Sequence, residues 1–570
     1  MQEWRIYSKK ADFSAIGKKY GIDQVIARVI RNRDIEGDAA MDSYLNGNVD
    51  SMYDPMLMKD MGKAVDILLD TIKNKRKIRI IGDYDIDGIC SIYILFKGLL
   101  FLGADVDYEV PDRIKDGYGI NENLIKQAYD DGREVILTCD NGIAATEQVR
   151  YARSLGFTVI VTDHHDIRYE EIDGKKTYIL PEADAIVNPK QSDCSYPCSF
   201  LCGAGVAYKL MQELFKRTGN EGKEREFLVF AGIATVGDVV DLKDENRIFV
   251  KEGLKQFKET DNYGLRALMV INGLDDKEIC AYHIGFIIGP CLNASGRLDT
   301  AKRALKMLLS KDKYEAESDL VSLNEERKSL TAAAVILAEK IVDENYTDDT
   351  VLVIYLPDCH ESIAGIVAGR IREKYYKPVI VLTKGEDGVK GSARSIESYN
   401  IFEKLCECSH LLTKFGGHPL AAGMSLKEDN IEELRKYLNE HSNLTKDDLT
   451  EKVWIDVPMP LEYINEDIIN ELSLLEPYGK GNEKPVFADK NLIIVSFMRI
   501  GRDGKFAKME LKKNNGMSIF AMCFNNCDGL NEAFINNKKI SCTYYPEINE
   551  FRGNKKLQIC ITGYRIEEDI

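Results

Sequence analysis

Apolar runs alternate with amphipathic stretches through the first half of the chain. The runs at 78–82, 106–110, 134–139 and 158–162 are short and apolar, which is typical of buried strands. Segments of helix length lie between them. Because strands that alternate with helices pair side by side in the same direction, the pattern predicts a parallel, doubly wound sheet.

The remaining patterns predict four further parts around this sheet. Residues 1–75 are mostly helical in pattern, and the α/β domain that carries the sheet is expected over 76–310. Residues 311–345 contain no Gly or Pro and predict one long connecting helix. A second α/β domain is expected over residues 346–445. The pattern of residues 446–570 predicts a linker followed by a small β-barrel of short alternating strands. The expected fold is therefore α/β and multidomain, with a C-terminal barrel.

Composition and charge limit the classes of function. The chain has 570 residues, of which 44% are hydrophobic and 30% charged, as in soluble globular proteins. It shows neither an apolar run of about 18 residues nor a signal peptide, so we expect a cytoplasmic protein with no membrane partner. A net charge of −17 disfavours indiscriminate binding to polyanions. A nucleic-acid partner would need local basic tracks.

Carboxylates and histidines stand at the ends of predicted segments in the first α/β domain. They are Asp83, Asp85, Asp87, Asp140, His164, His165 and Asp238. Because the carboxyl ends of parallel strands meet at one edge of a sheet, these side chains should converge there. Like charges so close repel one another unless cations neutralise them. An Asp-rich turn that only caps a helix is the alternative interpretation of residues 82–88 taken alone.

The mixture of carboxylate and imidazole suits Mn²⁺ and tolerates Mg²⁺. The ligands are too many for one ion once waters are counted, so we expect two metal ions about 3.5–4 Å apart, bridged by one carboxylate. Such a pair activates water and binds the oxygens of a phosphoryl group. His165 remains free to contact the phosphate.

The motifs and their order resemble the DHH phosphoesterase family. GDYDIDG, CDNGI, DHH and the Asp of ATVGDVVDL are similar to the four motifs of that family. The resemblance continues through PDR and DGYG at 111–119, LNASGRL at 292–298, GSARS at 391–395, FGGHP at 415–419 and PYGKGN at 477–482. In this order the motifs are similar to the RecJ family of single-strand-specific 5′→3′ DNA exonucleases.

The resemblance implies a metal-dependent exonuclease that releases 5′-mononucleotides from single-stranded DNA in repair and recombination. One metal ion would be bound by Asp83, Asp85 and Asp140, and the other by Asp87, Asp140, His164 and Asp238. Asp140 would bridge the two ions, and His165 would contact the scissile phosphate. Asp140, His164 and His165 are therefore the predicted catalytic residues. A helicase or a single-strand-binding protein is the expected partner, supplying the strand.

Further residues are expected to contact the substrate. In the two α/β domains they are His165, Arg113, Tyr118, Asn293, Arg297, Arg370, Arg394, Ser395, Gly416, Gly417 and His418. Gly416 and Gly417 are expected to form a turn that lets backbone approach a phosphate, with a plain turn as the alternative. Arg297 and Arg370 could instead form structural ion pairs. The strand-binding residues expected in the barrel are Arg499, Lys505, Tyr544 and Arg552.

Two other functions remain open on the sequence. A DHH phosphodiesterase acting on short oligoribonucleotides or cyclic dinucleotides is one, although such relatives are shorter and lack the barrel. A non-catalytic scaffold that binds single strands is the other, although such proteins lose metal ligands that this chain keeps. Cys291 stands where members of the family usually carry Arg, a departure that concerns substrate length more than hydrolysis.

Overall fold

A computed structural model describes residues 2–113, 115–172, 175–313, 316, 319–385, 388–501, 504–525, 527–551 and 553–567. These residues form two compact units. The first contains Tyr53–Asp238 and Glu252–Glu451, and the second contains Gln2–Met52, Val239–Lys251 and Lys452–Ile570. In the part of the chain that the structure describes, no helix combines the length and apolar character needed to cross a bilayer.

The first unit contains the parallel sheet that the apolar runs predicted. Its strands are β2 (Lys77–Ile81), β3 (Asp105–Glu109), β4 (Val135–Cys139), β5 (Thr158–Thr162) and β8 (Ala185–Val187). They lie in the order β3-β2-β4-β5-β8, and every neighbouring pair is parallel. The chain leaves β2 toward β3 on one side and returns to β4 on the other. Open α/β sheets bind ligands beyond the carboxyl ends of the strands at such a switch point.

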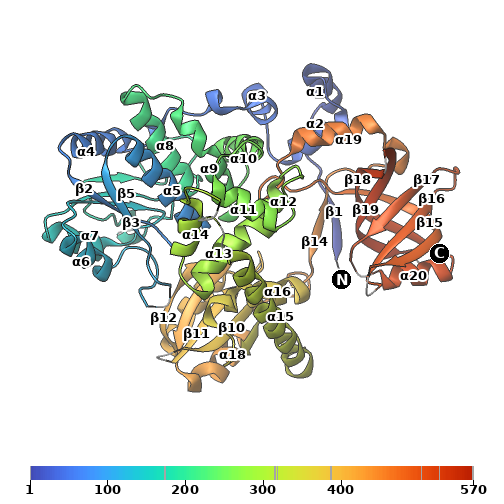
Figure 1. The fold of residues 1–570 in the computed structure, drawn as a ribbon. Helices are drawn as coiled ribbons and strands as arrows, with labels where there is room; N and C mark the ends of the chain where they lie inside the picture. The colour runs from blue at the N-terminus through green and yellow to red at the C-terminus, as the bar shows by residue number, and fades with distance from the viewer. Residues whose placement is uncertain are drawn as a thin grey trace. The chain divides into compact units, whose positions relative to one another are not determined.

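Helices cover both faces of this sheet (Figure 1). One face carries α6 (Glu122–Asp130) and α7 (Thr146–Ser154), and the other carries α4 (Met61–Lys73), α5 (Ile86–Phe101) and α8 (Gly203–Arg217). Helix α5 is buried along most of its length because it packs against the sheet, α8 and α9 (Leu228–Gly237). The uninterrupted apolar run after residue 88 therefore reflects a central helix.

Shorter elements surround the parallel sheet in the sequence. They are η2 (Pro55–Leu57), β6 (Tyr169–Ile172), β7 (Lys175–Tyr178), η3 (Lys223–Phe227), α10 (Asp244–Gln256), α11 (Tyr263–Ile271), α12 (Ala281–His283), the π-helical turn η4 (Ile284–Ile288), α13 (Gly289–Leu298) and α14 (Lys302–Leu308). Helix α10 contains residues of both units.

The connecting helix α15 spans Leu320–Asn345 and has 26 residues. It begins nine residues later than the sequence predicts, and the described residues just before it form turns and bends. The prediction of its start was wrong because a segment free of Gly and Pro permits a helix but does not require one. The helix begins where Leu320 becomes buried.

The second sheet of the first unit is mixed. Its strands are β9 (Leu352–Tyr355), β10 (Val379–Gly385), β11 (Gly388–Arg394), β12 (Leu412–His418) and β13 (Ala421–Leu426), in the order β12-β13-β11-β10-β9. Helices α15 and α16 (Glu361–Tyr375) share a core with one face of this sheet. Helices α17 (Ile401–Glu407) and α18 (Ile431–Glu440) share a core with the other. The short turns η5 (Ser409–Leu411) and η6 (Glu428–Asn430) lie beside them.

The second unit contains the predicted barrel. Strands β15 (Phe487–Ile500), β16 (Phe506–Lys512), β17 (Ser518–Cys523), β18 (Lys539–Phe551) and β19 (Asn554–Ile566) close in the order β15-β16-β17-β19-β18. Helix α20 (Asp528–Ile535) joins β17 to β18. Five strands with this closure form an oligonucleotide-binding (OB) type of barrel.

The N-terminal segment divides between the units. Strand β1 (Glu3–Ile6) pairs in parallel with β14 (Lys452–Ile455), and a buried ion pair of 2.7 Å joins Arg33 to Asp456. The other elements of the second unit are α1 (Phe13–Tyr20), α2 (Gln24–Asn32), α3 (Asp38–Asn46), η1 (Val49–Ser51), η7 (Leu461–Tyr463), α19 (Glu466–Leu472) and η8 (Ser473–Leu475). Residues 2–52 thus belong with the barrel, whereas α4 belongs with the parallel sheet.

Candidate two-metal centre

The loop after β2 presents three carboxylates at the switch point. Asp85 caps α5, because its Oδ1 accepts hydrogen bonds from the backbone N–H groups of Asp87 at 3.0 Å and Gly88 at 3.1 Å. Oδ1 of Asn293 accepts the N–H of Ile86 at 2.8 Å. The loop is therefore fixed from two sides. Asp85 caps the helix with one oxygen, and Asn293 positions the loop backbone.

Asp87 points at the first turn of α8. Its carboxylate accepts the backbone N–H groups of Gly203 at 2.6 Å and Ala204 at 2.7 Å. The amino end of a helix favours an anion at this place. A Cβ on Gly203 would lie 2.7 Å from Cβ of Asp140, so the close approach requires glycine. The sequence pattern did not predict this support for Asp87; the glycine at the start of the helix was the available signal.

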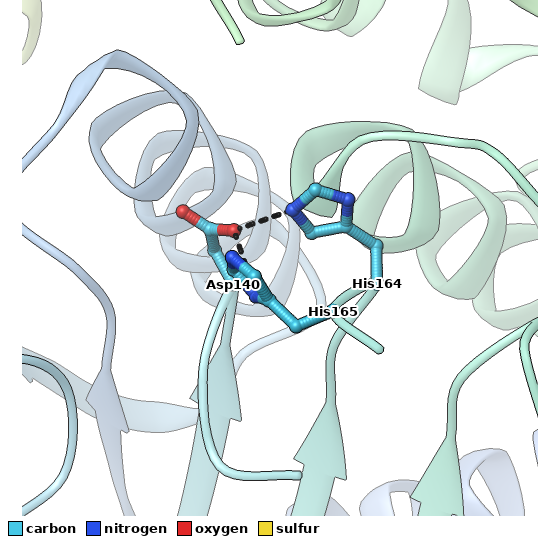
Figure 2. Close-up of side chains that lie close together, drawn as sticks. All are labelled: Asp140, His164 and His165. Carbon is cyan, nitrogen blue, oxygen red and sulfur yellow. Dashed lines mark ion pairs between the residues drawn. The ribbon is translucent and has the colours of Figure 1, made fainter. Parts of the chain in front are cut away.

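Asp140 lies at the centre of the site. Figure 2 shows both histidine rings beside its carboxylate, with Oδ1 3.1 Å from Nε2 of His164 and 4.0 Å from Nδ1 of His165. Nε2 of His164 also lies 3.5 Å from Asp87 Oδ2 and 3.7 Å from Asp238 Oδ2. The backbone of Asp140 has φ of 60°, a left-handed conformation that few non-glycine residues adopt and that Asp tolerates better than most.

All six predicted metal ligands come together. Together with His165, their ligand atoms form three groups, each within 4.8 Å: Asp83, Asp85 and Asp140; Asp87, His164 and Asp238; and Asp140, His164 and His165. Metal–oxygen bonds of about 2.1 Å at right angles put neighbouring ligand atoms about 3 Å apart. Within the described parts of the chain, the buried Oδ1 atoms of Asp83 and Asp140 and the buried Nε2 of His164 have no hydrogen-bond partner. Such unpartnered atoms are available to act as ligands of a cation.

Burial and mutual repulsion disfavour ionisation of the carboxyl groups, and bound cations would offset both effects. Burial, followed by repulsion from neighbouring carboxylates, raises the pKa of Asp87 to about 6 and that of Asp238 to about 8. The same causes raise the pKa values of Asp83 and Asp140 well above the usual range. Burial, followed by the nearby charge of His165, lowers the pKa of His164 to about 3. A neutral imidazole at this position has a lone pair available for a metal ion.

His165 is held by a different carboxylate. Asp163 is buried, and its Oδ1 lies 2.8 Å from Nδ1 of His165. Burial opposes ionisation of His165, but the hydrogen bond with Asp163 and the charges of the nearby carboxylates together outweigh it and raise the pKa of His165 to about 9. The Tyr118 hydroxyl donates to the Asp140 carbonyl oxygen at 2.8 Å and lies 3.2 Å from Nε2 of His165. Asp163 was not among the predicted site residues, although it stands first in the DHH motif.

Arginines gather near the carboxylates. The Arg113 guanidinium lies 4.9 Å from the centre of the Tyr84 ring. Burial, and then nearby guanidinium groups beginning with that of Arg113, lowers the pKa of Arg297 to about 10. Arg297 and Arg394 donate to carbonyl oxygens, of Ser362 at 2.8 Å and Ala393 at 2.7 Å.

Among the described residues, no carboxylate forms an ion pair with Arg113, Arg297 or Arg394. Desolvated cations without counter-ions suit an anionic ligand. Arg370 differs, because it is exposed and pairs with Glu373 at 3.4 Å.

Three predictions for the second α/β domain require correction or refinement. Gly416 and Gly417 form no turn: they lie in the edge strand β12, paired with Gly423 and Ala422. Pairing with β13 overrides the local preference of two glycines for a turn, and a Cβ on Gly417 would lie 2.4 Å from Ala421 O.

Ser395 is buried, and its hydroxyl donates to Tyr399 O at 2.6 Å, so it stabilises the chain after β11. His418 is exposed, with Nδ1 3.9 Å from Oδ2 of Asp166, the residue that follows His165.

The structure excludes one of the strand contacts expected in the barrel. Tyr544 is fully buried, and its hydroxyl donates to Met459 O at 2.6 Å, so the prediction that it contacts a strand was wrong. The alternation of Ile540, Cys542 and Tyr544 turns all three side chains inward. Arg499 pairs with Asp528 at 2.6 Å. Lys505 is exposed, and Arg552 lies outside the described residues.

The outer face of β16, β17 and β19 carries aromatic and basic side chains together. Phe506, Phe520 and Phe524 are exposed, and the rings of Phe506 and Phe524 lie 5.5 Å apart. The ammonium groups of Lys508 and Lys556 lie 5.5 Å and 5.8 Å from the centre of the Phe520 ring. We call Phe506, Lys508, Phe520, Phe524 and Lys556 the aromatic–basic face.

Three family models match successive parts of the chain. The DHH family N-terminal domain matches residues 77–235, the DHHA1 domain matches 348–442, and the RecJ OB domain matches 455–563. Together they cover the parallel sheet, the mixed sheet and the barrel.

Sequence relatives match over nearly the full length. The single-stranded-DNA-specific exonuclease RecJ of Bacillus subtilis (strain 168) is 35% identical over 99% of this chain and 71% of its own length. The enzyme of the same name from Haemophilus influenzae is 32% identical over 96% of this chain and 97% of its own.

Solved structures agree with these relatives. The crystal structure of RecJ from Thermus thermophilus in complex with Mn²⁺ has a TM-score of 0.84 and 26% identity, covering 100% of this chain and 80% of that one. The corresponding Mg²⁺ complex has a TM-score of 0.79 and 25% identity, covering 100% and 79%.

Proposed function

We propose, because this chain belongs to the RecJ family of single-stranded-DNA-specific exonucleases, that it hydrolyses single-stranded DNA stepwise from the 5′ end and releases 5′-mononucleotides. One observation carries the proposal more than any other. Asp140 belongs both to the group with Asp83 and Asp85 and to the group with His164 and His165. A carboxylate shared by two adjacent ligand groups is the arrangement that a two-metal phosphodiesterase needs.

The residues present fit two divalent cations. Asp83, Asp85 and Asp140 would hold one, and Asp87, Asp140, His164 and Asp238 the other. Bound there, the ions would activate a water and neutralise charge on the phosphate. Mn²⁺ is proposed as the preferred ion and Mg²⁺ as an alternative, since carboxylate with imidazole suits Mn²⁺ and the similar Thermus thermophilus structures contain one or the other.

His165 would act on the phosphate itself. It is partly exposed at the edge of the ligand cluster, and Asp163 keeps it protonated at neutral pH. An imidazolium aimed at a phosphodiester stabilises the negative charge that grows on its oxygens during attack. His165 is therefore assigned to transition-state stabilisation and His164 to metal binding.

The arginines would hold the 5′-terminal nucleotide. Arg113, Arg297 and Arg394 are proposed to bind its phosphate. Burial and nearby guanidinium groups, that of Arg113 among them, lower the pKa values of Arg297 and Arg394, and both of these arginines donate to neutral carbonyl oxygens. Tyr118 is proposed to contact the same nucleotide, since it lies beside His165. Arg370 and His418 are exposed and remain proposed contacts of the second domain.

The barrel would bind the strand farther from its end. On the aromatic–basic face, exposed phenylalanine rings offer stacking surfaces for bases, and lysines offer contacts for phosphates. Arg499 and Lys505 remain proposed contacts, although Arg499 must exchange its partner Asp528 for a phosphate. A cytoplasmic role in DNA repair and recombination, with a helicase or single-strand-binding protein supplying the strand, completes the proposal.

The test is digestion of one strand labelled at its 5′ end and one labelled at its 3′ end, each as DNA and as RNA, with Mn²⁺, Mg²⁺ or EDTA. Immediate release of a labelled mononucleotide from the 5′-labelled DNA, dependent on metal and absent on blunt duplex, is expected. Cleavage restricted to very short oligoribonucleotides or cyclic dinucleotides would show the phosphodiesterase alternative. Binding without cleavage would show a scaffold.

A further inference from the structure

We propose that Arg327, on the connecting helix α15, is an additional phosphate-binding residue for the single strand, positioned by Asn324 and Cys291. The inference rests on the proposed function and deepens it. It assigns Arg327 to a phosphate other than the one that is cleaved, and hence to the preference for a strand over a dinucleotide.

Asn324 connects Arg327 to the buried part of the catalytic domain. Its Oδ1 accepts hydrogen bonds from Nε and Nη2 of Arg327, at 3.1 Å and 2.9 Å. Because a guanidinium only donates, these bonds fix the orientation of the amide and turn its Nδ2 toward Cys291. The distance from Nδ2 to Sγ of Cys291 is 3.4 Å. Asn324 and Cys291 are both buried, so the amide has one available orientation and holds the guanidinium in one direction.

Arg327 keeps its positive charge uncompensated in this arrangement. The oxygen that it contacts belongs to a neutral amide, and no carboxylate among the residues described pairs with it. Glu325, two residues earlier, pairs instead with Lys328 at 2.7 Å. A half-buried guanidinium held by a neutral group is costly unless an anion completes it.

The surroundings of Arg327 are cationic. Helix α15 packs against α13, which carries Arg297. Burial and the nearby charge of Arg370 lower the pKa of Arg327, and Arg327 is in turn one of the guanidinium groups that lower the pKa of Arg297. Arg327 therefore extends the arginine group of the active site along the connecting helix.

A phosphodiester backbone is the ligand that this geometry suits. The N–H groups of Arg327 that Asn324 does not use can form paired hydrogen bonds to phosphate oxygens. Arg327 also comes from a different element than Arg113, Arg297 and Arg394. A strand whose terminal phosphate occupies that group would offer Arg327 the phosphate of a later nucleotide, whereas a dinucleotide would end before reaching it.

The test compares R327Q with K328Q, which removes the same charge from the neighbouring, exposed position. Binding of a labelled strand of about 15 nucleotides is measured in EDTA at several salt concentrations, so that no metal or turnover is needed. R327Q is expected to weaken binding about tenfold and to reduce the slope of log affinity against log salt by about 1, as for one lost phosphate contact. K328Q should change neither quantity.

Kinetics with Mn²⁺ separate a substrate contact from a structural role. R327Q should raise KM for the strand while kcat, and hydrolysis of a dinucleotide, stay at wild-type values. N324L removes the positioning amide at similar volume and should raise KM in the same way, and R327K should restore part of the affinity because it keeps the charge without the fork.

Equal behaviour of R327Q and K328Q, or an equal loss on strand and dinucleotide, would overturn the assignment. If the wild-type protein cleaves neither substrate, the proposed function fails. The binding comparison in EDTA still decides the role of Arg327 in that case.

Discussion

Oδ1 of Asp163 lies 2.8 Å from Nδ1 of His165, and the two side chains form a buried-to-exposed ion pair at the edge of the ligand cluster. Asp163 and His165 are the first and last residues of the DHH motif, and the carboxylate supports the histidine. Burial raises the pKa of Asp163, but the hydrogen bond with His165, the charges of the two histidines and the N–H of Ile143 together lower it to about 2, so the carboxylate stays ionised. His165 is thereby held as a cation beside Asp140, while His164 remains neutral.

The first prediction concerns this pair. His165 has a pKa of about 9, so activity that needs its cationic form should fall only above about pH 9. In D163N the carboxylate is lost, so the pH at which activity declines should move toward about 6.5, the ordinary pKa of histidine. H165Q should lower kcat about 10²- to 10³-fold with Mn²⁺ binding retained. The measurement is kcat against pH for the three proteins. An unchanged alkaline limb in D163N would contradict the role given to Asp163.

The second prediction concerns metal binding and stability. In the folded protein the pKa is raised to about 6 for Asp87 and about 8 for Asp238. The favourable contribution of these groups to the free energy of unfolding is therefore present below about pH 4, and it is lost as the pH rises through those values. The melting temperature of the metal-free protein should therefore fall between about pH 4 and pH 8. Mn²⁺ at about 100 times its Kd should stabilise by about 2.7 kcal/mol at high pH. Thermal melting in EDTA and in Mn²⁺ checks this, and a flat profile in EDTA would disagree with the burial of these carboxyls.

The third prediction concerns the shared carboxylate. D140N should abolish hydrolysis, with a loss of at least about 10³-fold, because both ligand groups that contain Asp140 lose it. Calorimetric titration should show a loss of Mn²⁺ affinity. D130N, at an exposed position on α6, is the matched control and should behave as wild type. Retained cleavage by D140N would place the metal centre elsewhere.

The fourth prediction uses glycine pairs. A Cβ on Gly417 would lie 2.4 Å from Ala421 O, whereas a Cβ on Gly416 has open space. G417A should therefore disturb the β12–β13 pairing and the adjacent His418, raising KM for a strand several-fold, while G416A should be tolerated.

Near the candidate metal ligands, G203A should weaken Mn²⁺ binding because of the 2.7 Å approach to Asp140, whereas G369A in α16 meets nothing within 4 Å. Steady-state kinetics and metal titration distinguish each pair.

The fifth prediction separates the surface of the barrel from its core. F520A, on the aromatic–basic face, should weaken binding of a long strand by about 1–3 kcal/mol if the ring stacks a base, without changing hydrolysis of a dinucleotide. Y544F should leave binding unchanged and cost about 1 kcal/mol of stability, since it removes the hydrogen bond to Met459 O. Strand binding and chemical denaturation of the two variants test this. Loss of strand affinity in Y544F with stability unchanged would restore Tyr544 as a contact.

The sequence alone predicted the parallel sheet and the grouping of the six candidate metal ligands. Short apolar runs mark buried strands, and the polar residues after each strand must lie at the same edge of a parallel sheet, so Asp83, Asp140 and His164 could be grouped without coordinates. Tyr544 could also have been placed correctly, because it shares its alternation with Ile540 and Cys542.

Only the tertiary structure decided the remaining features. Two glycines favour a turn locally, but pairing with β13 places Gly416 and Gly417 in a strand. The α8 backbone that binds Asp87 and the Asn324 amide that orients Arg327 depend on how separate helices pack. Residue type and position along a strand are local properties of the chain. Which atoms meet across distant segments is set by packing, and no local pattern records it.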